Sequence, residues 1–223
     1  MDDYQVTINT FDRLAGQYQE KYLVNEIYRE TYSVFCDLIE PHQKQLLDIG
    51  CGPGSVSLYL ANQITDLRIT GIDPAPAMIE LARENIPDGK FMTMDARHID
   101  EESAGLNHRS FDLIVCGFCI PYLAPDDVAR FVPACARLLR DEGLLYLSFI
   151  EGDSQNSRMM TNDSGDGVFM HFYDVDDIKK QLSLHGFSVI NEQRKKLNPE
   201  DDKADSDVFL IARRITTKSA AKE

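Results

Sequence analysis

The sequence predicts an α/β fold, a three-layer sandwich in which helices cover both faces of a seven-stranded, mainly parallel sheet. From Gln45 onward short apolar runs alternate with helical patterns, which is the order of strand-helix-strand crossover units. The last two apolar runs have no helix between them, so we expect them to pair as an antiparallel hairpin at one edge. A length of 223 residues suits one such domain with extensions.

Helices are predicted before the sheet. Between about residues 11 and 40, apolar side chains recur near the helical period of 3.6, which indicates one or two amphipathic helices. The positions are Leu14, Tyr18, Tyr22, Ile27, Tyr32, Phe35, Leu38 and Ile39. We expect residues 1–40 to form a helical extension that covers a ligand site, and residues 41–215 to form the main domain.

The central part of the chain supplies five strands with helices between them. The predicted strands are QLLDIG (45–50), RITGID (68–73), KFMTMD (90–95), FDLIVCGF (111–118) and GLLYLSFI (143–150). The predicted helices are SVSLYLANQI (55–64), AMIELAREN (77–85) and DDVARFVPACARLL (126–139). Apolar strand runs of this length, separated by helical segments, are typical of a buried parallel sheet.

The last third of the chain has a different pattern. A polar stretch from 151 to 167 predicts a mobile connection, and DVDDIKKQLSLHGF (174–187) predicts a helix that Gly186 ends. SVINEQRKKL (188–197) and DVFLIARRI (207–215) are the hairpin strands. Their basic run at 194–196 faces an acidic stretch at 200–207, which favours a solvated hairpin. We expect residues 216–223 to be frayed.

Composition excludes several classes of protein. The formal net charge of −14 disfavours a nucleic-acid partner, because phosphates would be repelled. No apolar run approaches the roughly 18 residues of a membrane span, and from the acidic, polar first ten residues we expect no secretion signal. The 5 cysteines and 5 histidines are scattered, so we expect reduced thiols, no metal site and a cytoplasmic location.

The strongest local signal is LLDIGCGPGS (46–55), where a strand turns sharply into a helix. Gly50, Gly52 and Gly54 leave no side chains between the backbone and a bound ligand. The dinucleotide fingerprint G-x-G-x-x-G would place its third glycine at Ser55. The spacing therefore argues against a nicotinamide or flavin enzyme.

Acids end the first three strands. Asp48 ends the first, Asp73 the second and Asp95 the third, with Ala96 following. A carboxylate at the tip of the second strand can accept hydrogen bonds from both hydroxyls of a ribose. The carboxyl ends of parallel strands meet at one edge of a sheet, so the sequence predicts a nucleoside site there.

These motifs, in this order, resemble the class I, Rossmann-like S-adenosylmethionine-dependent methyltransferases across roughly residues 10 to 213. LLDIGCGPG resembles the glycine-rich motif of that family, and GIDPAPAMIELAR and FMTMDAR resemble its second-strand and third-strand motifs. FDLIVCGFCIPYL and LLRDEGLLYLSFIEG resemble its fourth-strand and fifth-strand segments. The resemblance is to the small-molecule group that includes quinone-biosynthesis-type enzymes.

The resemblance implies a site for S-adenosylmethionine, whose product is S-adenosylhomocysteine. In such a site Gly50, Gly52 and Gly54 approach the methionyl and ribose parts of the cofactor. Asp48 helps to orient the methionyl amino group, and Asp73 holds the ribose hydroxyls.

The resemblance also implies contacts to the adenine and to the methionyl end. Met78 covers one face of the adenine, Asp95 accepts from its exocyclic amine, and the Ala96 amide serves a ring nitrogen. The Cys116 carbonyl contacts the methionyl end. TFDRLAGQY resembles a helix that brings a tyrosine to the cofactor carboxylate, which indicates Tyr18.

Alternatives remain for several of these residues. Asp95 is also a good helix cap, and Tyr18 is also a good packing residue, in which case Tyr22 would replace it. Cys116 and Cys119 form a C-x-x-C without a second pair, so a metal or redox site is not expected.

The acceptor is not identified by these motifs. Many relatives carry a histidine pair where this chain has Pro121 and Tyr122, so acceptor chemistry cannot be carried over. We expect Tyr122 and His171 near the substrate, with Tyr122, His171 or Glu151 as groups that could assist proton loss. No catalytic residue is assigned.

The predicted function is methyl transfer to a small-molecule acceptor by in-line displacement, carried out by a monomer or homodimer. Two alternatives use the same fold: a non-catalytic protein that binds the cofactor, and an aminopropyltransferase-like relative. The latter typically has acids after the fourth strand, and CGFCIPYL has none.

Overall fold

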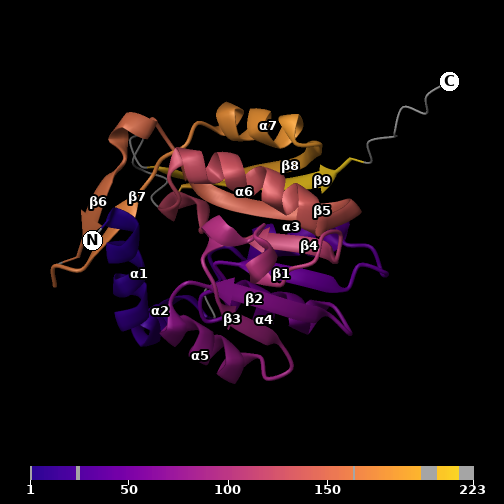
Figure 1. Cartoon of the computed structure of the whole chain (residues 1–223), viewed down its shortest axis with the longest axis horizontal. Helices are drawn as coiled ribbons and strands as arrows, with labels where there is room; N and C mark the ends of the chain where they lie inside the picture. Colours follow the sequence, from indigo (N-terminus) through magenta and orange to yellow (C-terminus); the bar gives the residue numbers. More distant parts are fainter. Residues whose placement is uncertain (1, 24–25, 163, 197–204, 216–223) are drawn as a thin grey trace.

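The central sheet of the computed structural model has seven strands in the order β3-β2-β1-β4-β5-β9-β8 (Figure 1). The structure describes residues 2–23, 26–162, 164–196 and 205–215. The strands are β1 (Gln45–Ile49), β2 (Arg68–Asp73), β3 (Lys90–Thr93), β4 (Phe111–Cys116), β5 (Leu139–Glu151), β8 (Phe187–Lys196) and β9 (Ser206–Arg214). β1 to β5 are parallel, and β9 runs antiparallel to both β5 and β8. The predicted fold class is confirmed.

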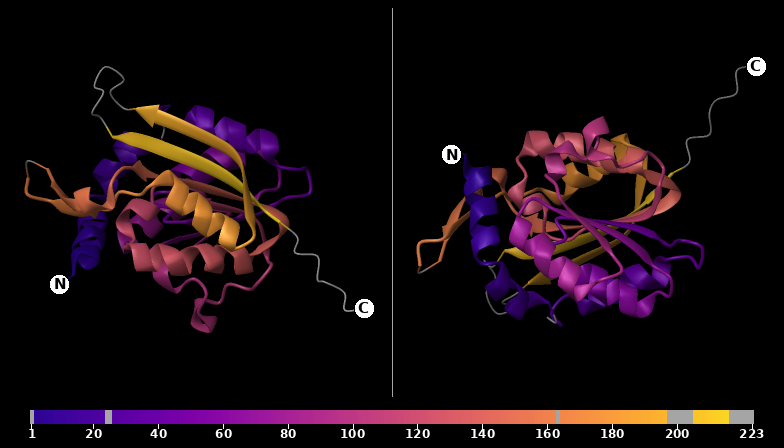
Figure 2. Two further views of the ribbon diagram at one scale, coloured as in Figure 1. Left: turned by 90° about the horizontal axis from the view of Figure 1, so that it is seen from above. Right: turned by 60° about the horizontal axis from the view of Figure 1, so that its bottom comes forward.

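Helices cover both faces of this sheet (Figure 2). They are α1 (Asp3–Arg13), α2 (Ala15–Tyr22), α3 (Arg29–Leu38), α4 (Ser55–Gln63), α5 (Pro76–Asn85), α6 (Pro125–Leu138) and α7 (Val175–Leu184). Phe35 of α3, Leu60 of α4 and Ile79 of α5 join one buried cluster. Phe131 of α6 and Ile178 of α7 join another on the opposite face. Short 3-10 turns occur at 96–98, 102–104, 120–122 and 154–156.

The amino-terminal region differs from the prediction, because three helices form there and the first begins at Asp3. Asp2 caps α1 by accepting a hydrogen bond of 2.8 Å from the Gln5 amide. The buried residues of α1 are Thr7 and Thr10. Because the buried positions of α1 are threonines, this helix has no apolar periodicity. The apolar pattern therefore predicted a first helix from about residue 11, after the start of α1.

The segment after β5 also differs from the predicted polar connection. β6 (Arg158–Thr161) and β7 (Gly167–Met170) pair as an antiparallel hairpin, which lies beside α1 in Figures 1 and 2. The Thr10 hydroxyl donates to the Gly167 carbonyl at 2.8 Å, and the Phe169 amide donates to the Thr7 hydroxyl at 2.9 Å. These partners are far apart in the sequence, so local composition gave no sign of the hairpin.

The carboxyl-terminal part matches the predicted order. Asp174 caps α7, and Gly186 after the helix has a φ of +78°. β8 and β9 form the predicted hairpin at the sheet edge, but Asp207 of β9 is buried. The link 197–204 and the tail 216–223 lie outside the described residues. In the part of the chain that is described, no helix is both long and apolar enough for a membrane span.

Candidate active site

The glycine-rich turn joins β1 to α4 and is fixed to the end of β2. The amides of Gly50 and Cys51 donate to the Ile72 carbonyl at 2.8 and 3.0 Å. Gly50 and Gly52 have φ angles of +67° and +53°, which favour glycine. Gly54, also with positive φ, is the N-cap of α4. The turn thus brings bare backbone to the carboxyl edge of the sheet.

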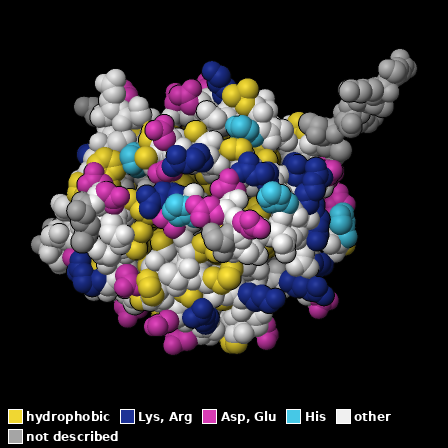
Figure 3. Space-filling model, viewed as in Figure 1, with side chains coloured by type: hydrophobic (Ala, Val, Ile, Leu, Met, Phe, Trp, Pro, Cys, Tyr) yellow, Lys and Arg dark blue, Asp and Glu magenta, His cyan; other side chains and the backbone are white. Residues whose placement is uncertain are grey.

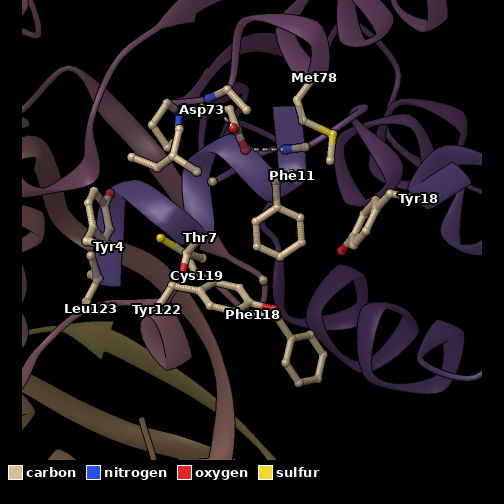
Figure 4. Close-up of a pocket in the computed structure, with 16 residues that line it drawn as sticks. Tyr4, Thr7, Phe11, Tyr18, Asp73, Met78, Phe118, Cys119, Tyr122 and Leu123 are labelled. Atoms are coloured by element: carbon tan, nitrogen blue, oxygen red, sulfur yellow. Dashed lines mark hydrogen bonds between the residues drawn. The ribbon is translucent and has the colours of Figure 1, made fainter. Parts of the chain in front are cut away.

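Asp73 ends β2 and holds this turn in place. Its Oδ2 accepts from the Gly52 amide and its Oδ1 from the Ala75 amide, each at 2.9 Å. Figure 4 shows the Asp73 carboxylate with a hydrogen bond drawn as a dashed line. Burial raises the pKa of Asp73 to about 6, against the effect of the two amide hydrogen bonds. Carboxylate oxygens can accept more than one hydrogen bond, so Asp73 retains capacity for ligand hydroxyls.

A cavity lies between α1, the glycine turn and the start of α5. Its described lining is Tyr4, Thr7, Ile8, Phe11, Tyr18, Gly50, Gly52, Asp73, Pro74, Ala75, Met78, Gly117, Phe118, Cys119, Tyr122 and Leu123. Figure 4 shows the ring of Phe11 between Asp73 and Met78 on one side and Tyr122 on the other. Several predicted site residues therefore come together in one place.

A larger cavity of about 350 Å³ begins at the same turn and extends toward α3 and β9. Its described lining is Tyr18, Tyr22, Leu23, Tyr28, Arg29, Tyr32, Asp48, Gly50, Cys51, Gly52, Pro53, Ser55, Val56, Leu58, Tyr59, Asn62, Gly117, Phe118, Tyr122, Ile150, Met170 and Asp207. Tyr18, Gly50, Gly52, Gly117, Phe118 and Tyr122 line both cavities. The two cavities meet at the glycine turn.

Asp48 is among the residues that line the larger cavity. Its side chain is buried and accepts a hydrogen bond of 2.6 Å from the Ser57 hydroxyl. Burial raises the pKa of Asp48 to about 7; the Ser57 hydrogen bond opposes the rise, and the charge of Asp73 adds to it. The site therefore holds two buried carboxyl groups whose proton affinities are both increased.

Four predicted cofactor residues line neither cavity. Gly54 caps α4, while Ala96 and Cys116 are buried. The Asp95 carboxylate is held by the Arg97 guanidinium, at 2.7 Å from Nη2, and by the Tyr4 hydroxyl at 2.9 Å. Burial alone would raise the pKa of Asp95, but the hydrogen bonds from Arg97 and Tyr4 outweigh burial and lower this pKa below its usual value. In this arrangement Asp95 connects α1 to the end of β3.

The two predicted substrate residues have different positions. Tyr122 lines both cavities, and its ring contacts the Phe11 ring at a centroid distance of 5.0 Å. His171 packs its ring on Phe169, and its amide donates to the Pro121 carbonyl at 2.7 Å. Burial lowers the pKa of His171. His171 is absent from the described lining of both cavities.

Sequence reasoning missed two groups of residues that the structure brings to the site. The first is the α1 face with Tyr4, Thr7 and Phe11, which carries no recognisable motif. The second includes Tyr28 and Asp207 of the larger cavity. Asp207 is the last of a run of acids that indicated a solvated hairpin. The only signal that set it apart from the other acids is that the apolar run of the last strand begins directly after it.

No metal cluster is evident within the described ranges. There, no three His, Cys, Asp or Glu side chains lie close enough together to hold an ion. All 5 cysteines are free thiols.

Comparisons with known proteins show which domain part of the chain resembles. The family model described as Methyltransferase domain matches residues 46–143. Trans-aconitate 2-methyltransferase of Escherichia coli is 38% identical over 102 residues, which cover 46% of this chain and 37% of that protein. Demethylmenaquinone methyltransferase of Thermotoga maritima is 29% identical over 143 residues, 61% of this chain and 58% of that protein. The chain thus matches less than two thirds of the length of either relative.

A solved structure agrees over nearly the whole chain. The 1,6-didemethyltoxoflavin-N1-methyltransferase of Burkholderia thailandensis, with bound 1,6-didemethyltoxoflavin and S-adenosylhomocysteine, superposes with a TM-score of 0.69 at 19% identity. The superposition covers 95% of this chain and 88% of that one, and it shows the shared fold. Residues 46–143 are thus similar to a methyltransferase domain, and the chain shares the fold of a solved methyltransferase.

Proposed function

We propose that this chain binds S-adenosylmethionine across the glycine turn and transfers its methyl group to a small-molecule acceptor in the larger cavity. The observation that carries the proposal is the hydrogen bond between Gly52 and Asp73 at the point where both cavities meet. It fixes a carboxylate and bare backbone side by side, as recognition of a ribose requires. We also propose a cytoplasmic enzyme, monomeric or homodimeric, without a nucleic-acid or membrane partner.

The described residues fit the cofactor. The Ser55 hydroxyl lines the larger cavity, is buried, and has no hydrogen-bond partner among the described residues. A buried hydroxyl of this kind is suited to a polar ligand group. Asp73 would hold the ribose, Met78 would cover the adenine, and Asp48 would face the methionyl amino group. The contacts proposed for Gly54, Asp95, Ala96 and Cys116 remain predictions; Asp95 would have to exchange part of its contact with Arg97.

The residues of the site would act mainly by orientation and by exclusion of water. Bound S-adenosylmethionine supplies a methyl group that is already strongly electrophilic. Tyr18 and Tyr122 line both cavities, and the Phe11 ring contacts both of their rings. These aromatic side chains would keep water from the cofactor. α1 and α2 contribute these residues together with the loop after β4, which supports a role of residues 1–40 as the cover of the site.

We expect S-adenosylhomocysteine to bind to the purified protein equally well with and without a metal chelator, because the ribose site consists of Asp73 and backbone amides. Isothermal calorimetry measures this directly. Absence of binding, or preferential binding of NAD, would contradict the proposed function. Transfer of radiolabelled methyl groups into a metabolite extract then distinguishes an enzyme from a non-catalytic binder.

Asp73→Ala is expected to weaken binding of S-adenosylhomocysteine by roughly 1 to 3 kcal/mol, because the ribose hydroxyls and the Gly52 amide lose a charged partner. Asp88→Ala, an exposed acid after α5, is the matched control and should leave the affinity unchanged. Circular dichroism verifies that both variants are folded. Equal affinities for the Asp73 variant and the wild type would assign Asp73 to a purely structural role.

A further inference from the structure

Asp207 is a buried acid at the carboxyl edge of the sheet. It lies at the start of β9, opposite Ile150 near the end of β5, and only 5% of it is exposed. Phe209 and Ile211, the next residues of the same parity, belong to the cluster under α3 and α4. Because side chains alternate along a strand, Asp207 belongs to that face too. It lines the larger cavity, where Phe118 and Ile150 are also found.

One phenolic hydroxyl already binds this carboxylate. The Tyr28 hydroxyl donates to Asp207 Oδ2 at 2.7 Å, and the Tyr28 ring packs against Phe118 and Phe209 at centroid distances of 5.0 and 5.3 Å. Both Tyr28 and Asp207 line the larger cavity. A carboxylate can accept several hydrogen bonds, so Asp207 can accept a second hydroxyl from the cavity while it keeps Tyr28.

The charged groups around Asp207 leave its carboxylate without an ion-pair partner among the described residues. Lys195 of β8 lies opposite Asp207 in the register of the two strands, but its ammonium donates to the Ile27 carbonyl and not to Asp207. Burial raises the pKa of Asp207, and the negative charge of Asp205, which precedes β9, also raises it. The hydrogen bond from Tyr28 acts in the opposite direction. Arg194 of β8 pairs with Glu151 and Glu192. An unpaired buried carboxylate gains more from a proton than an exposed one does.

The rest of the cavity favours an aromatic acceptor that arrives without negative charge. Its described lining includes the aromatic residues Tyr18, Tyr22, Tyr28, Tyr32, Tyr59, Phe118 and Tyr122. Arg29 is the one cationic side chain in that described lining; it is half-exposed and pairs with Glu26 at 3.0 Å. Asp48 and Asp207 are the acids. An anionic acceptor would meet these acids with little compensation.

We infer that the acceptor is an uncharged aromatic compound with a hydroxyl group, and that Asp207 takes the hydroxyl proton during methyl transfer. The inference rests on the proposed function. The acceptor oxygen forms a bond to the methyl carbon as the carbon-sulfur bond breaks, and the electron pair of that bond stays on sulfur. The O–H proton goes to Asp207, so the neutral acceptor and the sulfonium yield a methyl ether, a thioether and a protonated carboxyl group. No further reactant is required.

Probe binding to the protein saturated with S-adenosylhomocysteine tests the inference. The probes share one ring system: β-naphthol, its methyl ether, β-naphthoate and β-naphthylmethylammonium. We expect β-naphthol to bind at least about tenfold more tightly than the other three probes, as one added hydrogen bond to a charged group allows. In Asp207→Asn, which can still accept from Tyr28, the preference should fall below about threefold. Asp205→Asn, just before β9, is the control and should retain the preference.

The rate of methyl transfer gives a second test. If Asp207 had only a structural role, its replacement would not remove the pH dependence of this rate. Methyl transfer to β-naphthol should lose roughly a hundredfold or more in Asp207→Asn, as expected for loss of a proton acceptor. The wild-type rate should fall as pH decreases through the raised pKa of Asp207, and that decrease should be absent from the variant.

The outcomes separate the two proposals. If S-adenosylhomocysteine itself does not bind, the proposed function fails. If it binds but no naphthalene probe does, or β-naphthoate or the ammonium binds best, the acceptor class is wrong. If Asp207→Asn keeps both the tenfold preference and the turnover of β-naphthol, Asp207 is not the proton acceptor and only ties Tyr28 to the sheet.

Discussion

Asp48→Asn is expected to stabilise the empty protein at pH 8 and at the same time to weaken its binding of S-adenosylmethionine. Burial raises the pKa of Asp48 from 3.8 to about 7. The folded state therefore favours the protonated carboxyl group, and this contribution to stability is complete below pH 3.8 and lost as pH rises through about 7. At pH 8 the charged carboxylate costs on the order of 4 kcal/mol, which the neutral amide avoids.

The cofactor reverses the effect because its sulfonium and amino groups are positive. Asp48 in its charged form would attract them, so affinity for S-adenosylmethionine in the wild type should increase as pH rises through about 7. Asp48→Asn should lose roughly tenfold to a hundredfold in affinity at pH 8 and lose this pH dependence. The Asn carbonyl can still accept from Ser57, so the local packing is preserved.

Urea unfolding at pH 5 and pH 8, without cofactor, measures the stability change. Asp112→Asn is the contrasting variant, because Asp112 is a buried acid that pairs with Arg140 at 2.7 Å and accepts from the Lys44 and Gln45 amides. Its replacement should destabilise the protein by about 1 to 3 kcal/mol. If Asp48→Asn is also destabilising at pH 8, Asp48 carries out a structural role and the charge argument fails.

The parts of the site that sequence could predict are those made by consecutive residues. The glycine turn and Asp73 lie at strand ends, and strand ends of a parallel sheet meet at one edge whatever the rest of the chain does. Asp95 followed the same rule, but the structure places Arg97 and Tyr4 on its carboxylate. The position of an acid at a strand end does not show which neighbouring side chains bind its carboxylate.

The contacts that hold α1 over the site could not be predicted, because they are polar and join distant parts of the chain. α1 is held by Thr7 and Thr10, which bond to a hairpin more than 150 residues away in the sequence. Threonines and a polar hairpin have the composition of a surface loop. Asp207 was hidden in the same way, since its burial depends on Tyr28 and on the pairing of β9 with β5.

Gly50→Ala is expected to reduce mainly the stability of the fold, and Gly52→Ala mainly the binding of the cofactor. At Gly50 a Cβ would lie 2.8 Å from the Cys119 Cβ, at a φ of +67°, so the fold itself should lose about 2 to 4 kcal/mol through strain and overpacking. At Gly52 the nearest atom to a Cβ is Tyr18 Cε1 at 3.7 Å, an ordinary contact. Only the strain of its positive φ, about 1 to 2 kcal/mol, should reduce stability there.

Gly52→Ala should instead abolish cofactor binding. Gly52 lines both cavities where they meet, so a methyl group there occupies the surface on which the methionyl and ribose parts would lie. We expect affinity for S-adenosylhomocysteine to fall at least about a hundredfold, measured by calorimetry on a folded variant. Gly186→Ala, with a φ of +78° and, apart from its chain neighbours, no atom of the described residues within 4 Å of its Cβ, reproduces the backbone strain away from the site and should bind normally. Normal binding by Gly52→Ala as well would place the cofactor away from the glycine turn, because a ligand lying on Gly52 leaves no space for a side chain.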